Sequence, residues 1–355
     1  KENRILANNQ GDHMRNMLKV TLVFVMLLTT VFAQAKITGD VRVRPRIDIK
    51  STDGEETSNQ SLILYWGRLN VDADIGGGYS FHTKLASNWV GHWAGYMGSQ
   101  EVGNDVGLGN DRPTITFMEL SMSKNAGNWG VSAGNLPLNG VANHIVDLHY
   151  YPTSPVDIPW AIKHVQSIQG FSGFVKAGPG KLNWALSVDA NQNNSTAELV
   201  NKKTLMVDYG AKFGGITVKP QMAMTMDNDS TAAPMTMGAG VSGKVAGFTL
   251  SGTYLMTSNT VEGSGKYDGS HIRAGAKGNV GPGFLLAWYD IASVTPDGGD
   301  ATDYSFLWLL YKYTVHSSDK GSMVVMPTIR MRTGEPGNTD YSRNKFELTF
   351  QLNFK

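Results

Sequence analysis

Apolar and polar residues alternate with a period of two along almost the whole chain. This is the period of a β-strand, in which successive side chains point to opposite faces, and it differs from the period of a helix. The segment 216–226 is a clear example, because Ile216 and Val218 fall on one face while Thr217 and Lys219 fall on the other. The alternation therefore predicts an all-β fold whose two faces differ in polarity.

The links between the expected strands alternate in length. We expect strands at 37–50, 61–75, 79–90, 113–124, 128–136, 168–177, 181–190, 204–213, 216–226, 235–245, 248–257, 271–278, 283–292, 304–315, 322–332 and 344–355. Links such as 76–78 and 214–215 are short, and those between them, such as 51–60 and 91–112, are longer. Short turns at one end and longer loops at the other are typical of an antiparallel up-and-down β-barrel that spans a membrane. We therefore predict a transmembrane antiparallel β-barrel of about 16 strands (about 14 to 18), with short periplasmic turns and long extracellular loops.

One expected strand, 304–315, is apolar on both faces. Phe306 and Trp308 share a face with Lys312, so the pattern does not assign its inward side. A contact between subunits is one explanation.

The start of the chain has the pattern of an export signal. We expect residues 1–13 to be an upstream or tag-like segment and 14–35 to be a signal peptide, because a basic region precedes an apolar run at 20–32 and an Ala-Gln-Ala site. The barrel is then expected to occupy 36–355.

Composition excludes several classes of function. The chain has no Cys, which excludes disulfide scaffolds, thiol nucleophiles and Cys-ligated zinc. Its 31 Lys and Arg balance 30 Asp and Glu, so it lacks the basic excess of a nucleic-acid binder. The eight His are scattered, and none lies beside a Ser in a G-x-S-x-G turn. We therefore expect no nucleic-acid partner, no enzymatic activity, no cofactor and no metal site.

The end of the chain carries a resemblance to a known family. Residues 346–355 read FELTFQLNFK, an alternating strand that closes on an aromatic residue before Lys355. With the signal peptide, the absence of Cys and the Gly-rich strands, this resembles the bacterial outer-membrane porins. The resemblance implies that Phe350, Leu352 and Phe354 form an assembly signal for the barrel assembly machinery. It also implies a location in the cell outer membrane, contact with outer-membrane lipid and lipopolysaccharide, and a homotrimer as one option.

The face opposite the lipid face would line the lumen, and polar lumens hold water. The basic residues expected there are Arg42, Arg44, Arg46, Arg68, Lys84, Lys181, Lys212, Lys219, Arg273, Lys277, Arg330 and Arg332. The acidic ones are Asp48, Asp72, Asp74, Glu119, Asp189, Asp208 and Glu347. This basic excess predicts a modest preference for anions.

Closing the barrel would gather many of these charges on one wall. That wall would carry Arg42, Arg44, Arg46, Arg68, Arg330 and Arg332. Two interpretations remain: the arginines create a field in the pore, or they pair with Glu347, Asp72 and Asp74 and only stiffen the wall.

The longest link, 137–167, is the expected constriction loop. It carries Asp147, Asp157 and Lys163, and we expect it to fold into the pore, because loops of this length are usually functional or disordered. The alternative is a lid on the surface, with its prolines as turn residues.

The sequence thus predicts an outer-membrane porin that passes small hydrophilic solutes by passive diffusion. A substrate-selective channel for oligosaccharides or anions and a non-conducting structural or adhesin barrel are the alternatives.

Overall fold

The computed structural model describes residues 35–87, 95–96, 115–137, 167–193, 199–227, 234–259, 267–334 and 340–355. The expected signal peptide lies outside these ranges except for Ala35, which opens the first strand. Among the described residues, none belongs to a helix with the length and hydropathy of a membrane span.

The described residues form seventeen strands. They are β1 (Ala35–Thr52), β2 (Glu55–Gly76), β3 (Tyr79–Ser87), β4 (Gly95–Tyr96), β5 (Ile115–Asn125), β6 (Trp129–Pro137), β7 (Ser167–Ala177), β8 (Gly180–Asn193), β9 (Leu199–Phe213), β10 (Ile216–Asp227), β11 (Pro234–Val245), β12 (Phe248–Asn259), β13 (Tyr267–Val280), β14 (Gly283–Pro296), β15 (Thr302–Ser318), β16 (Gly321–Gly334) and β17 (Tyr341–Phe354). The two-residue β4, which the sequence did not predict, pairs with β2 at Leu64 and Tyr65. The other sixteen build the barrel.

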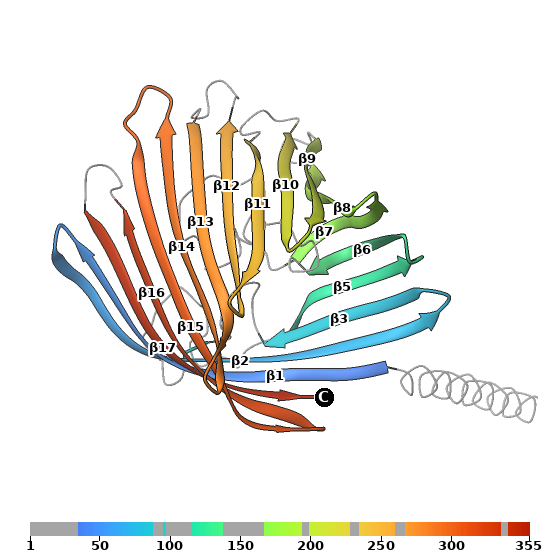
Figure 1. Cartoon of the computed structure of the whole chain (residues 1–355), viewed down its shortest axis with the longest axis horizontal. Coiled ribbons are helices and arrows are strands. Elements are labelled where there is room, and N and C mark those ends of the chain that lie inside the picture. Colours follow the sequence, from blue (N-terminus) through green and yellow to red (C-terminus); the bar gives the residue numbers. More distant parts are fainter. Residues whose placement is uncertain are drawn as a thin grey trace, which may run out of the picture.

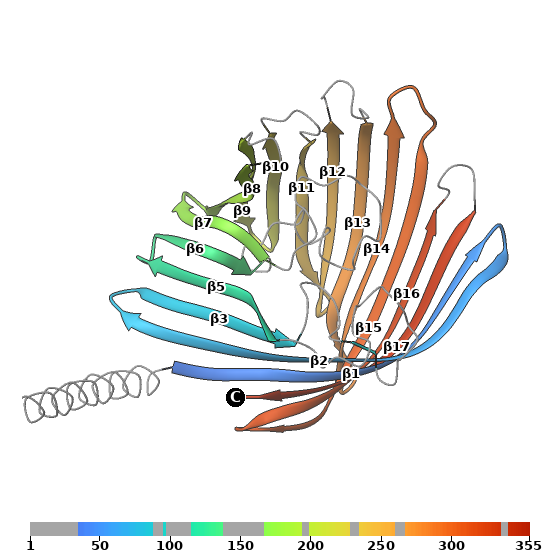
Figure 2. The same cartoon turned by 180° about the vertical axis from the view of Figure 1, so that it is seen from behind.

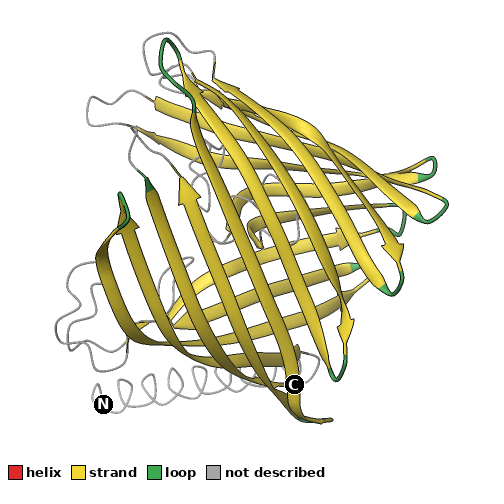
Figure 3. Ribbon diagram, turned by 60° about the vertical axis from the view of Figure 1, so that its left-hand side comes forward, coloured by secondary structure: helices red, strands yellow, loops and turns green. Residues whose placement is uncertain are grey.

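The barrel strands pair antiparallel with their neighbours in chain order, and β17 returns to pair with β1. Figures 1 and 2 show this order from two sides, with β17 beside β1. In Figure 3 the strands of the near and far walls cross in projection, as the tilted strands of a barrel do. The predicted closed antiparallel barrel of 16 strands is confirmed.

The outer surface of the barrel is apolar. Val41, Ile47 and Phe346 lie on it and are 47%, 46% and 44% exposed. The alternating residues face inward, and Asp48 among them is only 2% exposed. Such an exterior is unfavourable in water and suits a hydrocarbon environment, where a closed sheet also leaves no backbone edge unpaired.

β15 places apolar residues on both faces for a reason found inside the barrel. Phe306 and Trp308 are buried on the inner face, whereas Leu309 and Tyr313 are exposed on the outer one. The ring of Trp308 stacks on Trp288 of β14, with 4.7 Å between the ring centroids. Aromatic packing on the inner wall therefore accounts for the second apolar face.

The long loop predicted at 51–60 is wrong. β1 and β2 meet in a two-residue turn, in which Asp53 and Gly54 have φ angles of 52° and 81°. Two positive φ angles are typical of a type I′ hairpin, for which Asp-Gly is a preferred sequence. The Asp53 N–H donates to the Asp340 carbonyl at 2.7 Å, which ties this hairpin to the start of β17.

Some glycines make room for an aromatic ring on the neighbouring strand. A Cβ at Gly39 would overlap the ring of Phe354, its partner on β17. Gly130 stands in the same relation to Phe174 of β7. Part of the high Gly content therefore serves ring packing across strands rather than turns.

We expect Gly39→Ala to weaken closure of the barrel, because the new methyl group would collide with the ring of Phe354 on one neighbouring strand and with the backbone carbonyl of Arg68 on the other. Overpacking of this kind costs about 1–3 kcal/mol. The readout is the temperature at which the barrel loses its compact migration on a denaturing gel. Gly210→Ala is the matched control, since nothing lies within 4 Å of the added Cβ. Equal melting of both variants would contradict the packing argument.

Candidate channel wall

Closure of the barrel sets four strands from the two ends of the chain side by side, in the order β16, β17, β1 and β2. Residues directly opposite each other in an antiparallel pair share a face, so the register aligns the inward charges of these strands. We give the name basic wall to one cluster of charges on this inner surface. Its members are Arg42, Arg44, Arg46, Arg68, Arg330, Arg332, Arg343 and Lys345, with the carboxylates of Asp40, Asp48 and Glu347. Lys36, Lys50, Asp72 and Asp74 lie on the same inner surface outside this cluster.

Glu347 of β17 is the centre of the basic wall. Its side chain is 0% exposed, and the Arg46 Nε donates to its Oε1 at 2.6 Å. The Nη1 of Arg44 lies 3.3 Å from Oε2, and Arg330 also donates to Oε1. Three guanidinium groups around one carboxylate leave this point of the wall positive, in a site where charges are weakly screened.

The same sharing of a carboxylate recurs on both sides of this centre. Asp48 accepts two hydrogen bonds from Arg343, at 2.8 and 2.7 Å, and a lysine of β17 lies 3.7 Å from it. Asp40 accepts from Arg42 at 2.9 Å and from Arg68 at 2.7 Å. Cations therefore outnumber carboxylates along the whole basic wall.

Aromatic rings help to fix these guanidinium groups. The Arg68 guanidinium lies 4.8 Å from the ring centroid of Trp66, and that of Arg330 lies 5.0 Å from Trp308. A cation over a ring face is attracted by the ring quadrupole. The rings thus hold the arginines in place without neutralising them.

The structure brings the six arginines predicted for this wall together with Glu347, and it separates them from two expected partners. Asp72 lies 2.6 Å from the Nδ1 of His82. Asp74 accepts the Gly76 N–H at 2.8 Å, in an exposed turn. The interpretation in which the arginines pair with carboxylates therefore agrees with the contacts of Glu347. Asp72 and Asp74 have these other contacts, and Asp40 is the carboxylate that Arg42 and Arg68 share.

Other predicted pore-lining residues lie in smaller groups. One is the pair of Lys219 and Asp208, 3.4 Å apart between β10 and β9, and two more are as follows. Lys84 and Glu119 form an ion pair between β3 and β5, and Glu119 also lies 2.8 Å from the Nε2 of His82. On β13, Arg273 donates twice to Asp290 of β14, at 2.6 and 2.9 Å. In each of these last two groups one Lys or Arg faces one carboxylate, which also contacts a histidine, so these groups lack the excess of arginines that the basic wall has.

Three residues of the basic wall are not among those that the sequence predicts to line the pore. Asp40 precedes Arg42 by two residues and shares its face, so the alternation contains the signal for it. Lys345 likewise lies on the inward face of the last predicted strand. Arg343 falls in a predicted link, because the last strand begins earlier than its pattern indicates.

Asp147, Asp157 and Lys163, the residues of the expected constriction loop, lie outside the described residues. Within the described ranges, no group of three or more His, Cys, Asp or Glu side chains could hold a metal ion.

We expect Glu347→Gln to destabilise the barrel, because it leaves the three guanidinium groups without their shared anion. Removing one partner of a buried ion pair costs about 3–5 kcal/mol. The measurement is the urea midpoint of unfolding in detergent. Glu56→Gln serves as the control, since Glu56 is an exposed carboxylate at the start of β2. A midpoint equal to that of the control would mean that Glu347 is not the centre of the wall.

Comparison with known proteins agrees with this geometry. No protein-family model matches the sequence, and no curated protein does. Among solved structures, the anion-selective porin from Comamonas acidovorans matches with a TM-score of 0.61 at 12% identity, over 90% of this chain and 99% of that one. Salmonella typhi OmpF, in complex with daunomycin, matches with a TM-score of 0.58 at 11% identity, over 89% and 97%. The trimer form of OmpT from Vibrio cholerae matches with a TM-score of 0.53 at 11% identity, over 90% and 99%.

Each match covers most of this chain and nearly all of the matched chain. At sequence identities this low, the matches show a common fold and nothing more. Together with the closed ring and the apolar exterior, they identify the architecture: the chain has the 16-stranded barrel fold of the bacterial outer-membrane porins.

Proposed function

We propose that this chain forms a water-filled channel in the outer membrane, through which small hydrophilic solutes diffuse passively with a modest preference for anions. The observation that carries the anion preference is the basic wall, which holds eight cations and three carboxylates, with seven of the cations in contact with those carboxylates.

The channel part of the proposal is supported by the contrast between the two faces of the barrel. The exterior is apolar, whereas the described inner face carries many charged and hydroxyl side chains. Across the ring from the basic wall, Thr204 pairs with Thr225 at 3.1 Å and Thr236 with Thr257 at 2.7 Å between hydroxyl oxygens. Polar linings of this kind suit a lumen filled with water.

The anion preference follows from the excess of fixed cations on the basic wall. The opposite side of the ring carries the threonine pairs and an ion pair between Lys219 and Asp208, which lie 3.4 Å apart. Charge of one sign along a passage with low-dielectric walls raises the local concentration of counter-ions. Because the Debye length is about 10 Å at 0.1 M salt, the preference should weaken as salt rises.

The test is single-channel recording in a planar bilayer under a salt gradient. We expect stepwise conductance and a reversal potential of the anion-selective sign. The double variant Arg42→Gln/Arg44→Gln should shift that potential toward cations. It leaves Asp40 with Arg68, and Glu347 with Arg46, so the carboxylates keep partners.

A control for this experiment removes charge outside the wall. Lys320→Gln/Lys355→Gln neutralises two cations at the end of the barrel that carries the short turns, and it should leave the reversal potential unchanged. Absence of conductance steps would favour a non-conducting barrel, and conductance that saturates with an oligosaccharide would favour a substrate-selective channel. An unchanged potential in the arginine variant would remove the basic wall as the source of selectivity.

We also propose that the barrel forms a homotrimer in contact with outer-membrane lipid and lipopolysaccharide, because one structural match is a trimer form. Sedimentation in detergent gives the oligomer mass, and a monomer would contradict this part of the proposal.

A further inference from the structure

Six methionines gather on the outer surface of the barrel, on three adjacent strands. They are Met222, Met224 and Met226 of β10, Met235 and Met237 of β11, and Met256 of β12. We call this group the methionine patch. It lies toward the end of the barrel away from the short turns, on the opposite face of the sheet from the lumen.

The strand register sets these methionines directly beside one another. Met237 is paired with Met222 on one side and with Met256 on the other, so three thioethers form a row across three strands. Met235 is paired with Met224 in the next row, which lies nearer the end of the barrel away from the short turns. Met237 and Met256 are 42% and 48% exposed, and both lie on the outer surface of the barrel.

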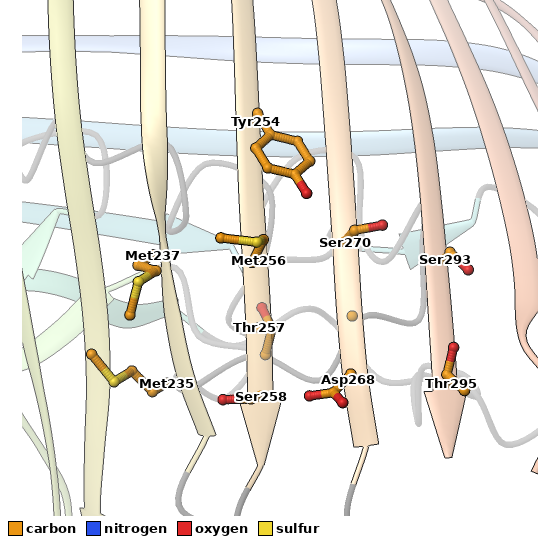
Figure 4. A pocket seen from close by; sticks show the side chains of 11 residues that line it. Met235, Met237, Tyr254, Met256, Thr257, Ser258, Asp268, Ser270, Ser293 and Thr295 are labelled. Carbon is orange, nitrogen blue, oxygen red and sulfur yellow. The ribbon is translucent and has the colours of Figure 1, made fainter. Parts of the chain in front are cut away.

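A groove begins at this row and continues toward β14. It has a volume of about 420 Å³. Figure 4 shows Met235, Met237 and Met256 on one side of it and the carboxylate of Asp268 on the other. Hydroxyl groups complete its polar part, from Ser258, Ser270, Ser293 and Thr295. An exterior built for lipid needs neither a methionine row nor a carboxylate next to it.

We propose that the methionine patch and this groove bind a soft monovalent cation, Cu(I) or Ag(I). Thioether sulfur is a soft donor that selects such ions over hard cations. With a metal–sulfur distance of about 2.3 Å, as in zinc thiolate sites, two sulfurs on one ion lie at most about 4.6 Å apart. Directly opposite residues of an antiparallel pair have Cβ atoms about 4.5–5.5 Å apart, and flexible methionine side chains close the remaining difference.

The carboxylate of Asp268 supplies the negative charge that the neutral thioethers lack. Thioethers are neutral, so a bound ion keeps its charge, and an ion at an apolar surface is costly without a counter-charge. Asp268 is exposed and lines the same groove as Met256. The expectation of no metal site rested on His, Cys and carboxylate patterns, which do not include thioether donors.

The experiment titrates the purified barrel in detergent with Ag(I), in chloride-free buffer, by calorimetry. We expect Met237→Leu/Met256→Leu to weaken the tightest site by about a hundredfold, because two donors are lost while the apolar volume is kept. Asp268→Asn should weaken it by about tenfold. In the wild type, the methyl NMR signals of the patch methionines should shift on binding, and those of other methionines should not.

The matched control is Met323→Leu/Met331→Leu on β16, which removes two exposed methionines on the same outer face but outside the patch. It should bind Ag(I) like the wild type. Should the patch double variant fail to fold, Met256→Leu alone repeats the test at the most exposed position. Wild-type affinity in the folded patch variants, or an equal loss in the control, overturns the proposal and leaves the groove as a lipid-facing surface.

Discussion

The demand that every backbone N–H and C=O be paired within the apolar band of a membrane shapes this molecule. An open sheet of sixteen strands would leave two unpaired edges, so β1 and β17 must meet. That closure creates more than a complete ladder of hydrogen bonds. It brings Arg46 within 2.6 Å of Glu347, residues separated by 301 positions. The basic wall is thus a product of closure, because neither end of the chain contains it alone.

The wall is built differently from a simple row of surface ion pairs. In the groups on β3/β5 and β13/β14, Lys84 and Arg273 each have a carboxylate, and such pairs stiffen a barrel without giving it a field. On the basic wall, each carboxylate is shared, so the ion pairs hold the cations in position and a positive excess remains. Both interpretations suggested by the sequence therefore describe part of the arrangement: the arginines are paired, and they remain in excess.

The sequence predicts most of the architecture, because alternation is a local property and lipid imposes it on every strand. The number of strands, their order and most of their inward faces follow from it. What local pattern cannot supply is register across distant strands, and so the sequence left open which carboxylates the arginines contact and did not identify Asp40 as one of them. The sequence also did not show which face of β15 points inward, because the ring that Trp308 stacks on belongs to another strand, β14. The turn at Asp53 was missed for another reason. The sequence contains an Asp-Gly pair, which is typical of a two-residue hairpin turn, but the prediction of a long link at 51–60 did not take it into account.

The pairing of Gly39 with Phe354 has a consequence for the kinetics of folding. Almost the whole chain separates these two residues, so the entropy of loop closure must be met before their contact contributes anything. A slip by one residue would also turn the aromatic ring toward the lumen. We therefore expect the pairing of β1 with β17 to be the slow step in folding of the barrel. The contact of the Phe354 ring with Gly39 helps to select the correct register when the two strands pair.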